Sequence, residues 1–262
     1  MRKEKKEEIK EEKEKEGGLE MKGENFEIKL KKIPKKGSVI IEGFPGMGFV
    51  ATIACDYMIK HLDTECIGEI FTKKFLPFAT IHEEKIIKPI EIFYDEKNNI
   101  VFIQSNIGTE GIEYDVAEII LEFAKKIGAS QIITIEGVIS YGKPEEGQTY
   151  YFTNNKKFDE VLNKKGFKKM REGIIVGVTG ALLLRAEDFP VVGFFTEVHS
   201  EMPDNRASAE IIKALDLYLG LNIDYAPLAK KAEEIEKKIK TFLSKILDVK
   251  KEKEKKVISY AG

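Results

Sequence analysis

Along most of this chain, short runs of largely apolar residues alternate with segments in which apolar residues recur at the spacing of a helix. Residues 39–41, 131–135 and 191–195 form runs of the kind that parallel strands need when both faces of a sheet are covered. After the first run, apolar side chains recur at 49, 50, 53, 54, 57 and 58, on one face of a helix. A second helical pattern follows from 112 to 127. This alternation predicts a single α/β domain of three layers, with a mostly parallel, mixed sheet between helices.

Shorter patterns account for the rest of the domain. Alternating apolar and charged residues from 26 to 30 predict a half-exposed strand, and Asn98-Asn99 marks a hairpin turn before a strand at 100–103. Further strands are predicted at 65–70, 149–153 and 173–178, and further helices at 157–164 and 181–186. A long loop is expected at 136–147. Asp204 is a candidate N-cap for a last helix that Gly220 ends.

The two ends of the chain differ from the middle. Residues 1–20 form a charged extension, in which positions 2–16 hold seven basic, seven acidic and one apolar side chain. We place the α/β domain at 21–226 and a heptad helix at 227–249, with Pro227 in its first turn. The apolar heptad positions are Leu228, Ala232, Ile235, Ile239, Phe242, Ile246 and Val249. This helix packs either on its own domain or on another subunit.

A charged spacer and an apolar tip make up residues 250–262. The tip residues of interest are Val257, Ile258, Tyr260, Ala261 and Gly262. Solvated tails rarely finish with Val, Ile and Tyr, so we interpret the tip as a docking peptide on a flexible tether. The alternative is an end that frays or packs back on its own subunit.

Composition narrows the possible functions. Hydrophobic residues make up 42% of the chain, and no apolar run approaches the roughly 20 residues of a membrane helix. The net charge of −2, despite 34% charged residues, argues against a nucleic-acid or membrane-surface binder. Cys55 and Cys66 lie in apolar segments without an export signal, which predicts reduced thiols in a cytoplasmic protein. Abundant Lys, Glu and Ile without Trp is typical of a thermophile protein.

A glycine loop, Gly43-Phe-Pro-Gly46-Met47-Gly48, joins the first buried strand to the helix after it. Glycines allow a turn that residues with a Cβ do not follow. Such a loop points backbone N–H groups at whatever lies above the end of the strand. Gly43, Gly46, Met47 and Gly48 therefore form either an anion-binding or ligand-binding loop, or a simple turn.

The segment Gly46-x-Gly48-x-x-Ala51 also matches the looser dinucleotide fingerprint, with Glu65 or Glu69 near the position of the ribose-binding acid. No partner for hydride transfer is evident downstream. A P-loop is excluded, because neither Lys-Ser nor Lys-Thr follows the glycines.

Other candidate chemistry is sparse. In an extended segment Glu197, His199 and Glu201 share a face, where a metal or general base is conceivable, but no second His or Cys completes a site. We interpret them as part of an ordinary charged loop. Gly-x-Ser-x-Gly is absent, and Cys55 and Cys66 have structural settings. The sequence therefore predicts no catalytic residue, no metal site and no cofactor.

Several segments together resemble the archaeal proteasome assembly chaperone family, over about residues 36–228. They are Gly43-Phe-Pro-Gly-Met-Gly-Phe-Val-Ala-Thr-Ile-Ala-Cys-Asp-Tyr-Met-Ile-Lys-His-Leu62 with Ile67-Gly-Glu-Ile70, then Gly180-Ala-Leu-Leu-Leu with Val192-Gly-Phe-Phe-Thr-Glu197, and Pro203-Asp-Asn-Arg-Ala-Ser-Ala209 leading into Leu219-Gly-Leu-Asn-Ile-Asp224. The combination of the glycine loop with the Pro-Asp helix start is what makes the resemblance specific.

This resemblance implies a fold similar to purine nucleoside phosphorylases without their activity, a symmetric homo-oligomer, and a non-enzymatic role in guiding proteasome α-subunits into rings. Family members that engage the proteasome end with a hydrophobic residue, Tyr and any residue, and insert this tail between α-subunits. Here Tyr260 is third from the end and Ser259 precedes it. Ile258, Tyr260 and the carboxylate of Gly262 match the pattern with one extra residue.

Other functions remain open. One is a phosphorylase-like or nucleotide-binding enzyme that uses residues 43–48 as an anion cradle. Another is an oligomeric scaffold whose tail is inert. For the chaperone, the expected partners are proteasome α-subunits or a related assembly chaperone.

Overall fold

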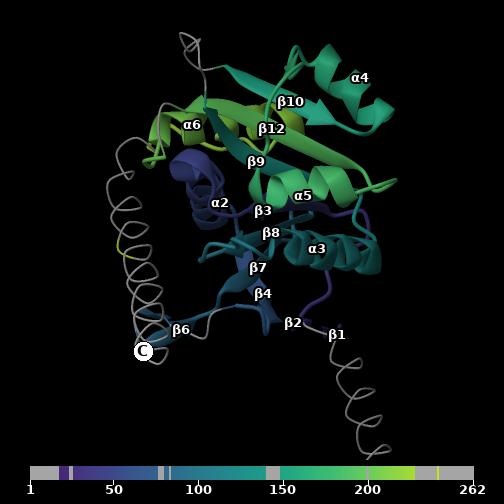
Figure 1. The fold of residues 1–262 in the computed structure, drawn as a ribbon, viewed down its shortest axis with the longest axis vertical. Helices are drawn as coiled ribbons and strands as arrows, with labels where there is room; N and C mark the ends of the chain where they lie inside the picture. Colours follow the sequence, from purple (N-terminus) through teal and green to yellow (C-terminus); the bar gives the residue numbers. More distant parts are fainter. Residues whose placement is uncertain are drawn as a thin grey trace, which may run out of the picture.

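In the computed structural model, the described residues are 18–23, 26–75, 80–82, 84–139, 148–198, 201–227 and 241. They form one large mixed sheet with helices on both faces (Figure 1). The strands are β1 (Leu19–Lys22), β2 (Phe26–Leu30), β3 (Val39–Gly43), β4 (Thr64–Thr72), β5 (Thr80–His82), β6 (Lys85–Ile87), β7 (Ile90–Asp95), β8 (Ile100–Ser105), β9 (Gln131–Ile139), β10 (Thr149–Thr153), β11 (Lys168–Lys169) and β12 (Val191–Val198). The helices are α2 (Val50–His61), α3 (Glu113–Ile127), α4 (Lys156–Lys164), α5 (Gly177–Arg185) and α6 (Asn205–Leu219), with a short 3-10 helix, η1 (Met47–Phe49).

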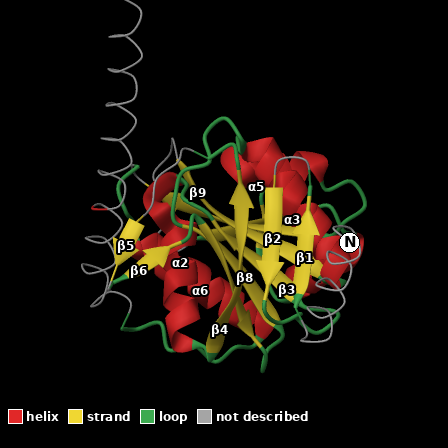
Figure 2. Cartoon of the chain, turned by 90° about the horizontal axis from the view of Figure 1, so that it is seen from below, coloured by secondary structure: helices red, strands yellow, loops and turns green. Residues whose placement is uncertain are grey.

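The large sheet has the order β1-β2-β4-β7-β8-β3-β9-β12-β10-β11. Its centre, from β8 to β12, is parallel, because the crossovers between these strands contain helices. One flank is an antiparallel series in which β8, β7, β4, β2 and β1 pair in turn. Strands β5 and β6 form a separate hairpin beside the large sheet (Figure 2). The predicted mixed sheet is confirmed, but parallel pairing is concentrated at its centre and does not predominate over the whole sheet.

Each central strand is covered on both faces. Ile41 packs in the core with α2 and α6, whereas its neighbour Ile40 packs in the core with α3 and α5. Ile133 and Ile132 of β9 divide in the same way. Figure 1 shows the two helix pairs on opposite sides of the sheet. Because both faces of these strands are covered, apolar residues can follow one another without alternating with polar ones. The predicted three layers are confirmed.

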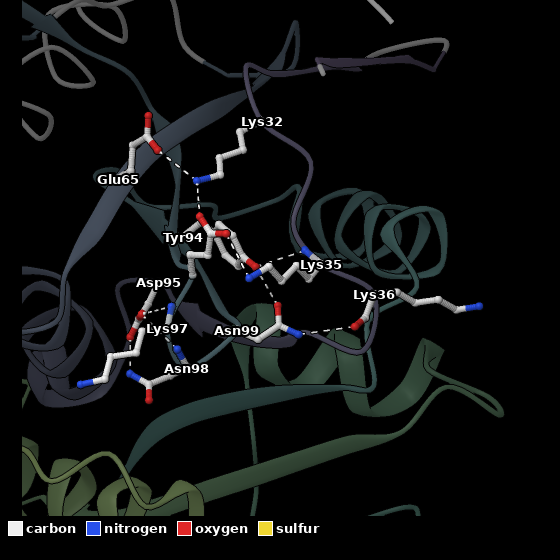
Figure 3. Close-up of polar contacts among 10 residues, drawn as sticks. Lys32, Lys35, Lys36, Glu65, Tyr94, Asp95, Lys97, Asn98 and Asn99 are labelled. Atoms are coloured by element: carbon white, nitrogen blue, oxygen red, sulfur yellow. Dashed lines mark hydrogen bonds and ion pairs between the residues drawn. The ribbon is translucent and has the colours of Figure 1, made fainter. Parts of the chain in front are cut away.

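The predicted hairpin joins β7 to β8, and side chains fix its turn (Figure 3). Asp95 Oδ1 accepts hydrogen bonds from Lys97 N–H at 3.0 Å and from Asn98 N–H at 3.2 Å. The hydroxyl oxygen of Tyr94 lies 2.9 Å from the side-chain amide of Asn99 and accepts a hydrogen bond from Lys35 N–H at 3.1 Å. The turn is thereby linked to the segment that leads into β3.

Two long helices end as the sequence predicts. Gly128 and Gly220 follow α3 and α6 with φ of 67° and 73°, in the left-handed region that favours glycine. Asp204 begins α6, since its Oδ1 accepts a hydrogen bond from Ala207 N–H at 2.9 Å. The Asp204 N–H also donates to Gly48 O at 2.9 Å, which attaches the start of α6 to the glycine loop.

The prediction of a strand at 173–178 is wrong. Residues 173–176 have no regular secondary structure, and α5 begins at Gly177. Ile174 is 88% exposed and Val176 is 57% exposed, so neither lies in a covered sheet. A run of consecutive apolar residues resembles a buried strand in sequence, but here nothing in the described chain packs over it. The buried residues that follow, Val178 to Leu182, belong to α5.

Two further differences concern loops and ends. β9 continues to Ile139, past Glu136, where we expected the loop to start. The remainder of that loop, residues 140–147, lies outside the described residues. The predicted helix at 227–249 lies outside them too, apart from residues 227 and 241, as do residues 1–17 and the tail at 250–262.

Candidate functional site

Three glutamates cross the carboxyl ends of the parallel strands in a diagonal line. Glu42 lies in β3, Glu136 in β9 and Glu197 in β12. Glu42 pairs with Thr134 of β9, and Glu136 lies two residues beyond Thr134. Glu136 in turn pairs with Phe195 of β12, and Glu197 lies two residues beyond Phe195. Since side chains alternate with a period of two, all three belong to the sheet face covered by α3 and α5. Ligand sites of α/β proteins form at this end of a parallel sheet.

Glu42 is fully buried. Its carboxylate accepts hydrogen bonds from Phe44 N–H at 3.2 Å and from Thr179 Oγ1 of α5 at 3.2 Å. Removal from water disfavours the charged form, so burial raises the pKa of Glu42 to about 7 against the effect of these two donors. Glu42 thus links the start of the glycine loop to α5 through a group that is partly protonated near neutral pH.

Glu136 holds the far end of the same loop. Its Oε1 accepts a hydrogen bond from Met47 N–H at 3.0 Å, and the residue is only 7% exposed. Burial, and secondarily the charge of Glu42, raise the pKa of Glu136 to about 8, while the backbone donors Met47 and Gly137 act in the opposite direction. Glu136 is therefore mostly protonated at neutral pH.

Close approach explains two of the loop glycines. An added Cβ at Gly46 would lie 2.1 Å from Glu136 Oε1. Gly48 has a φ of 63°, and an added Cβ there would lie 2.9 Å from Val198 Cγ1. The next residue, Phe49, also has a left-handed φ, of 50°, which is uncommon for a residue with a side chain. The sequence prediction of a sharp turn here is confirmed.

Two N–H groups of this loop are used within the chain. Phe44 N–H donates to Glu42 and Met47 N–H donates to Glu136, as described, and just after the loop Phe49 N–H donates to Gly46 O at 3.0 Å. The acidic group that faces the loop therefore comes from the protein's own strand. An external anion would have to displace Glu136 to reach the same donors.

The topology does not fit the dinucleotide interpretation. In that motif the ribose-binding acid follows a strand next to the first one. Here the next strand along the chain is β4, which is separated from β3 by β7 and β8, or roughly 14 Å at ordinary strand spacing. On β4, Glu65 pairs with Lys32 and Glu69 pairs with Lys88.

A cavity of about 1140 Å³ opens beside Glu136 and Glu197. Its walls combine the ends of β9 and β12, Met47 of η1, and residues between 163 and 176. Its charged lining residues are Glu136, Lys168, Lys169, Arg171, Glu172 and Glu197. Oε2 of Glu197 is buried and has no hydrogen-bond partner among the described residues. This cavity is the candidate functional site of the described chain.

The other predicted candidates are not brought together. Glu197 lines the cavity, Glu201 is exposed and does not line it, and His199 lies outside the described residues. No group of three potential metal ligands occurs in the described part of the chain. Cys55 is buried, which raises the pKa of its thiol, and it packs as predicted; Cys66, also assigned a structural setting, is exposed on β4.

Sequence reasoning did not single out Glu42 or Glu136. The available signal was a Glu-Gly pair at the end of an apolar run, since Glu42-Gly43 and Glu136-Gly137 both interrupt buried strands in the same way. A lone acid in such a run is expensive to bury and therefore marks a special environment.

The tail residues Val257, Ile258, Tyr260, Ala261 and Gly262 lie outside the described residues.

Together, the parallel centre, the two helical layers and the cavity at the strand ends define a three-layer α/β protein with one candidate site. The PAC2 family model matches residues 40–243, so the chain belongs to the PAC2 family. None of the helices in the described ranges has the length and hydrophobicity of a membrane span.

Known proteins resemble nearly the whole domain. The crystal structure of PbaA from Pyrococcus furiosus, described as an archaeal homolog of proteasome-assembly chaperone, has a TM-score of 0.75 and 25% identity, covering 85% of this chain and 99% of PbaA. PbaB of the same organism, described as an archaeal proteasome activator, has a TM-score of 0.71 and 20% identity, covering 84% of this chain and 99% of PbaB. In sequence, an uncharacterized protein of Methanocaldococcus jannaschii, MJ0106, is 27% identical over 81% of this chain and 88% of its own length.

Proposed function

We propose that this chain is a non-enzymatic, cytoplasmic chaperone that assists the assembly of proteasome α-subunits. The observation that carries the proposal is the similarity to PbaA over 99% of that protein, within the PAC2 family. The use of the loop donors by Glu42 and Glu136 also supports it, since the loop then shapes the domain instead of cradling a substrate.

In this proposal the protein works as a homo-oligomer that presents its carboxyl ends. The residues Val257, Ile258, Tyr260, Ala261 and Gly262 dock on α-subunits, with Tyr260 and the terminal carboxylate as the recognition groups. Several tails per oligomer raise the effective concentration of each, so that weak individual docking is sufficient.

Deletion of residues 257–262 tests the tail. We expect the full-length chain to capture α-subunits from its own lysate and the truncated chain to lose that capture, while light scattering gives the same oligomer mass for both. The matched control carries the same six residues in reverse order, which preserves composition and length. Equal capture by all three chains would refute docking through the tail and favour a scaffold whose tail is inert.

The enzyme alternative is favoured by one observation, the cavity at the carboxyl ends of β9 and β12. Calorimetry with phosphate, nucleosides and NAD separates it from the chaperone. We expect no binding. Micromolar binding that is lost in Gly46→Val or Gly48→Val would instead support a phosphorylase-like or nucleotide-binding protein.

A further inference from the structure

The cavity contains an acidic inner wall that is incompletely satisfied. Glu136 and Glu197 lie on adjacent strands, on one face of the sheet, with their Cα atoms roughly 8 Å apart at ordinary strand spacing. Both line the cavity, and Oε2 of Glu197 is buried without a hydrogen-bond partner among the described residues. A buried carboxylate oxygen without a donor is costly, so a donor brought in by another molecule would be strongly favoured.

The segment on the other side of the cavity has the opposite character. Lys168, Lys169 and Arg171 supply three cationic groups against one acid, Glu172, and Lys169 Nζ already pairs with Asp159 Oδ1 at 2.8 Å. Further along the same segment, Ile174 and Val176 also line the cavity and remain largely exposed. An occupant therefore meets acidic groups on the strands, and cationic and apolar groups on residues 168–176.

We infer that this cavity binds a lysine or arginine side chain of a partner polypeptide, with its cationic head between Glu136 and Glu197. A metal ion is a poorer match, because no three His, Cys, Asp or Glu side chains of the described residues lie close enough together to hold one. A free polyamine is also a poorer match, since Lys168, Lys169 and Arg171 would repel its second charge. A peptide supplies one cation for the inner wall and apolar neighbours for Ile174 and Val176.

Protonation adds a signature to this binding. The pKa of Glu136 is about 8, so its carboxyl is mostly protonated near pH 7. A cation placed beside it favours the carboxylate and lowers its pKa, so the complex releases a proton. The other titratable groups near this site are Glu42 within the sheet and, in the lining of the cavity, Tyr150, Lys168, Lys169, Arg171, Glu172 and Glu197.

The test uses full-length protein and two blocked tetrapeptides, acetyl-Leu-Lys-Leu-Asp-amide and the same peptide with norleucine in place of lysine. We expect calorimetry near pH 7 to show binding of the lysine peptide about tenfold tighter than the norleucine peptide. Glu197→Gln should remove that difference, whereas Glu201→Gln, the same charge change outside the cavity, should retain it. Urea unfolding of both variants establishes that they fold.

Proton release supplies a second readout. Heats measured in buffers of different ionisation enthalpy should show proton release for the wild type and none for Glu136→Gln, whose amide oxygen can still accept from Met47 N–H. Equal affinity for both peptides, no binding of either, or an unaffected Glu197→Gln overturns the inference. Butylammonium binding as tightly as the lysine peptide overturns the assignment to a polypeptide. The lining residues named above are all retained when residues 257–262 are deleted, so the peptide test can be repeated on the truncated chain and read separately from the test of the tail.

Discussion

Burial alone makes Glu42 sensitive to pH. Its carboxyl ordinarily ionises with a pKa of 4.5, but in the folded protein the pKa is about 7. At a pH between 4.5 and about 7, Glu42 has lost its proton in the unfolded state but still holds it in the folded state. The free energy of unfolding therefore falls as the pH rises through this range. This pKa shift corresponds to a contribution of roughly 3 kcal/mol to the free energy of unfolding. The contribution is present in full below pH 4.5 and is lost by about pH 7.

We predict that Glu42→Gln removes about half of the decline in stability between pH 5 and pH 8, with Glu136 responsible for most of the rest. The neutral amide keeps the size of the side chain but has no proton to lose. Urea unfolding at pH 5, 6, 7 and 8 measures the slope. Glu201→Gln, at an exposed position, serves as the control and should keep the wild-type slope. If Glu42→Gln keeps it as well, the buried carboxyl is not the source.

The glycines make a second prediction at this scale. Gly48 and Gly111 both have left-handed φ, of 63° and 85°, but only Gly48 has atoms within 4 Å of an added Cβ. Gly111→Ala should therefore cost about 1–2 kcal/mol of unfolding free energy from backbone strain alone. Gly48→Ala should cost about 2–4 kcal/mol, because contact with Val198 adds to the strain. Equal losses in urea unfolding would show that this contact is relieved by a small movement.

At the scale of elements, the start of α6 depends on one side chain. Asp204→Ala removes the acceptor for Ala207 N–H and should lower the free energy of unfolding by about 1 kcal/mol. Asp204→Asn keeps an oxygen at the same place and is the matched control. Thermal or urea unfolding of the two variants is the measurement. A loss of the same size in both would point to the charge of Asp204 instead of its hydrogen bond.

Elements with unambiguous local signals could be predicted from the sequence. The helix of α6 has a capping acid, a periodic apolar face and a terminal glycine, and each of these acts within a few residues. Residues 173–176 carried only a short apolar run, which suits a buried strand and an exposed connection equally well. What decides between them is whether another layer packs over the run, and that is a tertiary property.

At the scale of the whole molecule, the sequence predicts three layers but not the order of strands. The alternation of runs requires helices on both faces, yet β3 comes to lie between β8 and β9 only through long-range pairing. The line of Glu42, Glu136 and Glu197 depends on that order, since each belongs to a different strand. Single acids in three separate apolar segments could be seen in the sequence, but their alignment could not.

The margins of the large sheet restrict how copies of this chain associate. At one margin β11 has only two residues, both exposed lysines. At the other, β1 has four residues, and its Lys22 pairs with Glu20 and Glu27. Short, charged outer strands are poor templates for further strands. Open-ended growth of the sheet from molecule to molecule is thereby disfavoured, so an oligomer of this chain would have to form through its helical faces and loops.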